Sequence, residues 1–161
     1  MPVLVLDGNA ASRTWSLTPD AEARLCDAAP AGWDVRVMRS ATSSDGDGAT
    51  RPADEVIEAI ADAEVYVGFG ISRHAFAAAR QLRYVHSLAA GVRGALYPAM
   101  VESSVVLTNS AGVHAIPIAE TVIGGVLALL RGLYIAIEQQ RRATWDKQPF
   151  VGDDSPLREL G

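Results

Sequence analysis

Residues 64–86, EVYVGFGISRHAFAAARQLRYVH, contain the pattern that decides the fold. The run at 64–67 is rich in branched and aromatic residues and predicts a buried strand. A glycine-containing turn follows it, and Ser72 is a suitable N-cap for a helix over 72–79. The run at 83–86 then predicts a second strand. Two strands joined by a helix lie parallel in one sheet, because a parallel pair needs a long crossover.

Similar runs continue this alternation toward both ends of the chain. Residues 39–54 interrupt it, because they are rich in Ser, Asp, Gly and Thr, have no apolar period, and predict an exposed, mobile loop. The further strands are expected at residues 3–6, 33–38 and 105–107, and the further helices at 18–29 and 54–61. The sequence therefore predicts an α/β fold in which residues 1–107 form one flavodoxin-like domain, a parallel sheet flanked by helices.

Composition and charge limit the classes of function. The 161 residues carry a net charge of -5 and give a pI of about 5.1, which argues against nucleic-acid and anionic-membrane partners. The single cysteine, Cys26, excludes an internal disulfide, and the N-terminus lacks the pattern of a signal peptide. Three histidines and one cysteine show no metal-ligand spacing, so no metal site is expected. These features predict a cytoplasmic protein.

A different pattern occupies residues 108–161, which are expected to form a hinge, a long helix and a linker. Residues 122–130 are apolar on every side, so a helix there must be buried all round. The pair Gly124-Gly125 lowers helix propensity, which is tolerable where another backbone comes close. Such a helix needs a second domain or a second subunit to cover it. We expect a homodimer through residues 121–142.

Three loops are expected at one edge of the sheet, where the carboxyl ends of parallel strands form ligand sites. They lie at residues 7–9, 68–71 and 87–92. In the last of them Ala89 and Ala90 are small and Gly91 has no Cβ, so a ligand can approach the backbone closely. Successive backbone N–H groups at such a turn can hold an anion. On spacing alone, an ordinary strand-to-helix turn is the favoured interpretation.

Four segments carry a likeness to a known family. They are LRYVHSLAAGV (82–92), VLTNSAGV (106–113), residues 116–131 with Ala119-Glu120, and Trp145 with residues 157–161. They resemble, in this order, the substrate-binding loop, the crossing into the nucleotide-binding domain, the helix that follows, and the link to the cofactor fingerprint of the D-isomer-specific 2-hydroxyacid dehydrogenases. Their order and spacing agree with that family over most of the chain.

The resemblance implies an oxidoreductase that transfers a hydride between NAD or NADP and C2 of a D-2-hydroxy acid or its 2-oxo acid. Backbone N–H groups would hold the substrate carboxylate, and Phe69 would either cover an apolar substituent or fill the cleft. His114 would either face the ligand or cap the next helix. The substrate-binding residues it implies are Gly68, Phe69, Gly70, Ala89, Ala90, Gly91 and Val92, with Asn109 and His114 at the cleft and hinge.

The dinucleotide-binding fingerprint of that family is absent from this sequence. Gly68-Phe69-Gly70 begins a G-x-G-x-x-G motif, but Arg73 occupies the position of its third glycine. The resemblance implies that the fingerprint and the catalytic Arg, Glu and His follow Gly161. We therefore expect a truncated substrate-binding portion with no catalytic residue in this chain, little binding of NAD or NADP, and no activity by itself.

The alternative is a stand-alone flavodoxin-like binding or signalling module without redox activity. A phosphoacceptor receiver needs an acidic cluster after its first strand and an Asp after its third, where this chain has only Asp7 and Gly68. A flavodoxin needs a hydroxyl-rich phosphate loop after its first strand, to which Ser12 and Thr14 are a weak match. The dehydrogenase interpretation is therefore preferred.

Overall fold

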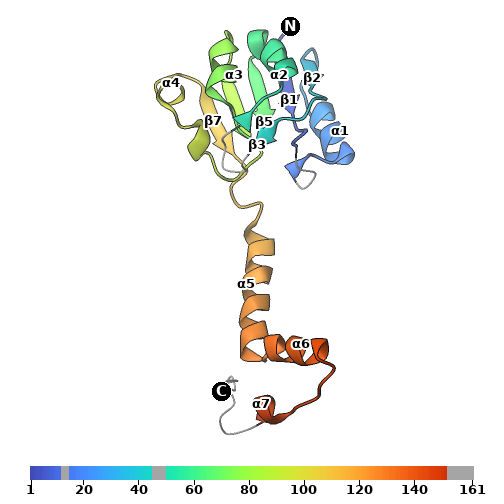
Figure 1. The fold of residues 1–161 in the computed structure, drawn as a ribbon. Helices are drawn as coiled ribbons and strands as arrows, with labels where there is room; N and C mark the ends of the chain where they lie inside the picture. Colours follow the sequence, from blue (N-terminus) through green and yellow to red (C-terminus); the bar gives the residue numbers. More distant parts are fainter. Residues whose placement is uncertain (12–14, 45–49, 152–161) are drawn as a thin grey trace. The chain divides into compact units, whose positions relative to one another are not determined.

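A five-stranded parallel sheet forms the centre of the N-terminal part of the chain (Figure 1). Its order is β2-β1-β5-β6-β7, and every neighbouring pair is parallel. The strands are β1 (Val3–Asp7), β2 (Asp34–Val37), β5 (Val65–Gly68), β6 (Tyr84–Ser87) and β7 (Val106–Asn109). The predicted α/β fold, a parallel sheet flanked by helices, is confirmed.

Short helices connect these strands, and two of them begin with a capping hydroxyl group, one of which is the predicted cap Ser72. The Thr18 hydroxyl accepts a hydrogen bond from the Ala21 N–H at 3.2 Å, and the Ser72 hydroxyl accepts one from the Ala75 N–H at 3.0 Å. The helices are α1 (Pro19–Asp27), α2 (Asp54–Ala59), α3 (Arg73–Ala78) and α4 (Pro98–Val101), with 3-10 turns η2 (Ile60–Asp62) and η3 (Arg93–Ala95). Local capping therefore sets where α1 and α3 start.

The apolar core packs against the face of the sheet that α2 and α3 cover. Val5 and Val85 from the sheet and Val56 and Ile60 from the helical side belong to one cluster, and each is 0% exposed. Fully burying a side chain of this size contributes about 1.5–3 kcal/mol. Helix α1 contributes no fully buried residue. The opposite face of the sheet is therefore less completely covered in the described residues.

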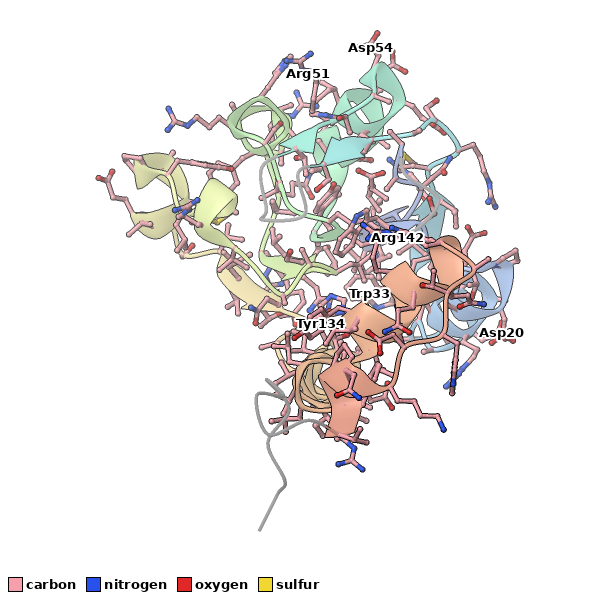
Figure 2. All side chains as sticks on the ribbon, turned by 60° about the horizontal axis from the view of Figure 1, so that its bottom comes forward. Asp20, Trp33, Arg51, Asp54, Tyr134 and Arg142 are labelled. Carbon is pink, nitrogen blue, oxygen red and sulfur yellow. The ribbon has the colours of Figure 1, made fainter. Side chains whose placement is uncertain are left out.

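Charged side chains lie at the surface of this part of the chain. Asp20, Arg51 and Asp54 are exposed and extend outward (Figure 2). On the edge strand β2, the Arg36 guanidinium bonds the carboxylates of Asp34 at 2.9 Å and Asp62 at 2.7 Å. The charge on the edge strand discourages pairing with another chain.

The prediction of an exposed loop over residues 39–54 is wrong in part. Strands β3 (Ser43–Ser44) and β4 (Thr50–Arg51) pair antiparallel, and Thr42 is only 3% exposed. The Thr42 N–H donates to the Asn9 carbonyl at 2.8 Å, and the Ala11 N–H donates to the Thr42 carbonyl at 3.0 Å. Hydrogen bonds rather than apolar burial hold this segment, so it carries no apolar period. Residues 45–49 lie outside the described residues.

The chain divides into two compact units, Met1–Val113 and His114–Gly161. The structure is a computed structural model, and it describes residues 1–11, 15–44 and 50–151. The sheet and its helices belong to the first unit. The second contains α5 (Ala115–Leu130), α6 (Leu133–Arg141) and α7 (Gln148–Val151). The assignment of 1–107 to a substrate-binding domain and 108–161 to hinge, helix and linker stays a prediction.

The prediction of one continuous helix over residues 121–142 is wrong, because α5 and α6 are separate and bent by 71°. Gly132 precedes α6 with φ of 63°, a left-handed conformation that glycine adopts without strain. No single helix in the described part of the chain is long and apolar enough to cross a membrane. The pair α5 and α6 meets that test only together, by length and composition.

The apolar side chains of α5 are not buried within the second unit. Ile116 is 73% exposed and Leu129 is 68% exposed, and α5 contains no buried residue. The all-round burial expected from the sequence is therefore not provided by the described residues. The expected cover by a second subunit or domain stays a prediction.

Candidate functional site

The carboxyl ends of four neighbouring strands form one row across the sheet. Asp7 pairs with Gly68, Gly68 with Ser87, and Ser87 with Asn109. The register thus brings the three predicted edge loops together and adds the end of β7. In a parallel sheet this is the edge where ligands bind.

The loops after β5 and β6 are joined directly. The Leu88 N–H donates to the Gly68 carbonyl at 2.7 Å. Phe69 is 8% exposed and shares a small apolar cluster with Ala10 and Ala89, while the Trp15 ring lies edge-on at 6.4 Å from the Phe69 ring. Phe69 is thus packed inside the first unit, and its contact with a substrate stays a prediction.

Two glycines of the β5 loop are required by local geometry. A Cβ on Gly68 would lie 2.5 Å from the Tyr66 hydroxyl and 2.8 Å from Cζ of that ring. Gly70 has φ of 135°, which side chains with a Cβ rarely adopt. Glycine at these two positions is therefore explained by the local geometry of the loop, independently of any ligand.

The loop at residues 88–92 is held from the β7 side through its carbonyls. The Asn109 Nδ2 donates to the Ala90 carbonyl at 2.5 Å, and the Ser110 N–H donates to the Ala89 carbonyl at 3.3 Å. By contrast, the backbone N–H groups of residues 89–92 donate to no acceptor in the part of the chain that the structure describes. Such a run of unpaired donors is suited to an anion.

A buried carboxyl group that the sequence did not indicate as functional lies at the end of β1. Asp7 is 1% exposed, and its Oδ2 accepts hydrogen bonds from the Tyr66 hydroxyl at 2.7 Å and the Thr42 hydroxyl at 2.8 Å. Burial raises the pKa of Asp7, and the two hydroxyl groups act in the opposite direction. Burial and the nearby carboxyl raise the pKa of Tyr66 well above its usual range. These hydrogen bonds connect the end of β1 to β5 and to the loop after β2.

A second polar group lies on the other face of β6 and β7. His86 Nδ1 is 2.9 Å from the Thr108 hydroxyl, and His86 Nε2 is 3.2 Å from the Ser110 hydroxyl. The Thr108 hydroxyl is also 2.7 Å from that of Tyr84. The alternation of side chains along a strand predicts that these side chains lie on one face. Which residues of β6 and β7 lie beside each other depends on the register of the sheet.

His114 belongs to the second unit, where it occupies the N-cap position of α5. Its carbonyl accepts a hydrogen bond from the Ile118 N–H at 3.0 Å, and its side chain makes no capping hydrogen bond. Of the nine predicted site residues, all except His114 thus belong to the first unit. Its role at a cleft stays a prediction.

Two of the cavities lined by described residues lie away from these loops. One of about 630 Å³ in the second unit is lined by residues that include Trp145 and Phe150, and one of about 420 Å³ in the first unit by Arg73 and Tyr97, among others. Burial raises the pKa of Tyr97 to about 12.

Among the described residues, no group of three or more His, Cys, Asp or Glu could hold a metal ion. The loop at residues 88–92 itself offers backbone N–H donors.

The chain is similar in sequence to D-3-phosphoglycerate dehydrogenase of Methanocaldococcus jannaschii, with 28% identity over 111 residues. The match covers 67% of this chain and 21% of that relative, so the chain spans about a fifth of the relative's length. No family model matches the chain.

The solved structures that share the fold include the following three. A D-isomer specific 2-hydroxyacid dehydrogenase family protein from Aeromonas salmonicida has a TM-score of 0.62 at 22% identity, over 90% of this chain and 41% of that one. A phosphoglycerate oxidoreductase from Rhizobium etli has 0.56 at 18% identity, over 99% and 45%. An NAD-dependent formate dehydrogenase from Staphylococcus aureus, in complex with NAD, has 0.57 at 14% identity, over 92% and 44%.

These likenesses have different weight. At under 25% identity the solved structures show the fold, and they agree with the parallel sheet described above. The curated relative adds a sequence match over two-thirds of the chain. The resemblance to the D-isomer-specific 2-hydroxyacid dehydrogenases is thereby confirmed as a family-level match.

Proposed function

We propose that this chain is the substrate-binding part of an NAD- or NADP-dependent oxidoreductase that acts on D-2-hydroxy acids and 2-oxo acids. One observation carries the proposal: the N–H groups of residues 89–92 have no acceptor among the described residues, although neighbouring carbonyls in the loop are bonded. A 2-oxo acid offers a carboxylate beside a ketone, and both are acceptors. The loop supplies the donors that such a ligand needs.

The small side chains of this loop support a site in which backbone N–H groups bind the ligand. Ala89 is 0% exposed and packs against Phe69, so its methyl group points away from solvent. Ala90 and Gly91 add little bulk around the N–H groups. Hydrogen bonds to a charged acceptor are about twice as strong as neutral ones. Backbone donors alone can therefore hold a carboxylate.

The residues of this chain do not fit the dinucleotide cofactor. After β5, Gly68 and Gly70 are followed by the buried Ile71, and Arg73 stands where the fingerprint needs its third glycine. The resemblance assigns the hydride chemistry to NAD or NADP. We propose that these residues bind the acid without transferring a hydride.

Oxalate tests the carboxylate site, because it is a planar dianion that is not reduced. Titration of the ¹⁵N-labelled chain is expected to shift the amide signals of residues 89–92 first. Uncharged oxamide, with the same shape, is the matched control and should leave them in place. The proposal would be contradicted if oxalate did not shift the amide signals of this loop, or if oxamide shifted them equally.

Turnover tests the proposal that these residues bind the acid without transferring a hydride. Glyoxylate, pyruvate and phenylpyruvate with NADH or NADPH should give no loss of absorbance at 340 nm above the rate without protein. Turnover by pure material whose mass ends at Gly161 would show that the chain is a complete enzyme.

We also propose that the chain forms a homodimer through residues 121–142. Support comes from the exposure of Leu127 (46%), Leu129 (68%) and Ile137 (51%), because extensive exposure of large apolar side chains is typical of interaction sites. Sedimentation at micromolar concentration should show a dimer, and Leu129→Arg should yield a monomer. A wild-type monomer whose α5 amides are protected from hydrogen exchange would point to burial within the chain instead.

A further inference from the structure

The exit from β7 controls which way the loop at residues 88–92 presents its donors. A peptide group is planar and trans, so its carbonyl and its N–H point in opposite directions. The Ala89 carbonyl is held by the Ser110 N–H at 3.3 Å, and the Ala90 carbonyl by Asn109 Nδ2 at 2.5 Å. Those two bonds turn the N–H groups of Ala90 and Gly91 away from β7.

Ser110 is itself held in place from the far face of the sheet. Its N–H is shared between the carbonyls of Ser87 at 3.0 Å and Ala89 at 3.3 Å. Its hydroxyl lies 3.2 Å from His86 Nε2, and the other ring nitrogen lies 2.9 Å from the Thr108 hydroxyl. With both nitrogens engaged, the imidazole cannot rotate without losing a hydrogen bond.

His86 is the centre of a continuous hydrogen-bonded chain. The Tyr84 hydroxyl can donate to the Thr108 hydroxyl, which donates to His86 Nδ1, and the proton on Nε2 is then donated to the Ser110 hydroxyl. The reverse direction also satisfies every group. A glutamine amide offers one donor and one acceptor as well, whereas a leucine offers neither.

We infer that His86, Asn109 and Ser110 are positioning residues for the carboxylate-binding loop, an inference that rests on the proposed role of residues 89–92. Asn109 and Ser110 hold the loop carbonyls, and His86 holds Ser110. None of the three needs to touch the substrate. The orientation of the backbone N–H groups in this loop thus depends on β7 and the residues that follow it as much as on the loop's own sequence.

Oxalate affinity and loop order together test this inference in the full 161-residue chain. His86→Leu, Ser110→Ala and Asn109→Ala should each weaken oxalate binding about five- to tenfold, the effect of one lost hydrogen bond to a fixed group. The heteronuclear NOE of the Ala90 and Gly91 amides should fall in the same variants. His86→Gln should restore most of both properties. His74→Leu, at an exposed position on α3, is the matched control and should change neither.

The outcomes separate this inference from the proposed function. If the wild-type chain does not bind oxalate at residues 89–92, the proposed function fails, and the NOE values still decide the positioning role. Wild-type binding with equal affinity and equal NOE values in all three variants would overturn the inference. So would a loss of thermal stability with unchanged oxalate affinity, because that result indicates a structural role alone. If His86→Leu does not fold, Ser110→Ala decides, since it removes a single hydroxyl.

Discussion

Asp7 has an environment that differs from what its residue type would suggest, because its carboxyl group is buried. A carboxylate that leaves water loses hydration, and burial is accordingly the largest influence on the pKa of Asp7, which it raises. The hydroxyl groups of Tyr66 and Thr42 both bond its Oδ2, while Oδ1 has no partner in the described structure. Half of the carboxyl group is therefore uncompensated, which is why protonation is favoured.

The first prediction concerns the pH dependence of stability at Asp7. Because its pKa in the folded protein lies above the ordinary 3.8, the folded state keeps this proton at a pH where the unfolded chain has released it. The contribution of this proton to stability is therefore complete below 3.8 and is lost as the pH rises through the folded-state value. Urea unfolding of wild type and Asp7→Asn, measured from pH 7 to pH 4, should show wild type gaining stability relative to the variant. A constant difference, or one of opposite sign, would contradict the raised pKa.

The second prediction concerns the contact between Gly68 and Tyr66. The Tyr66 ring is 1% exposed and its hydroxyl is bonded to Asp7, so it cannot move aside for a Cβ on Gly68. Gly68→Ala should lower the free energy of unfolding by about 1–3 kcal/mol, as other overpacked sites do. Adding Tyr66→Phe removes the nearest atom and should make the Gly68 substitution less costly. Equal costs in the two backgrounds, measured by urea denaturation, would exclude this contact as the cause.

Sequence reasoning found part of this residue-scale geometry. It placed Asp7, Gly68 and Ser87 at one sheet edge, because strand ends can be recognised from local composition. It could not pair Asp7 with Thr42 and Tyr66, which are 35 and 59 positions away. Such pairs depend on the register of the sheet. The same holds for Asn109, which was expected at a cleft and whose side chain bonds the Ala90 carbonyl.

At the scale of elements, the strands and the helix caps could be predicted from the sequence. The pairing of β3 with β4 and the bend between α5 and α6 could not. Branched runs and capping hydroxyls act over a few residues, so β1, β6 and the start of α3 followed from local pattern. Thr42, which precedes β3, is held by hydrogen bonds with residues that follow β1, and local composition does not record such contacts. The bend between α5 and α6 depends on Gly132, one of several glycines in that region and the one with a left-handed backbone.

The third prediction concerns the bend at Gly132. An Ala at φ of 63° is strained by about 1–2 kcal/mol, so Gly132→Ala should destabilise the α5–α6 connection. Gly124→Ala is the matched control, since a Cβ there meets nothing within 4 Å and helix propensity improves by about 1 kcal/mol. Thermal melting followed at 222 nm should therefore shift down for the first variant and up for the second. A rise in both helicity and midpoint for Gly132→Ala would mean that α5 and α6 can join into one helix.

At the scale of the whole molecule, burial is distributed unevenly between the two units. The buried hydrophobic residues run from Val3 to Met100, so those that the structure describes all belong to the first unit. The second unit exposes apolar residues along α5 instead. The long apolar helix was predictable from composition, but composition alone does not show what covers it.

The fourth prediction follows from this distribution. A chain of residues 1–113 retains the sheet, the core and the Asp7 and His86 groups, so it should unfold cooperatively at nearly the same urea midpoint as the full chain. It lacks the exposed helices, so it should also sediment as a monomer where the full chain associates. Full-length Leu129→Arg is the control that separates loss of the apolar surface from loss of the segment. Because the loop at residues 88–92 is anchored within the first unit, the shorter chain should bind oxalate as the full chain does. An unfolded fragment would show that the second unit contributes to the stability of the sheet.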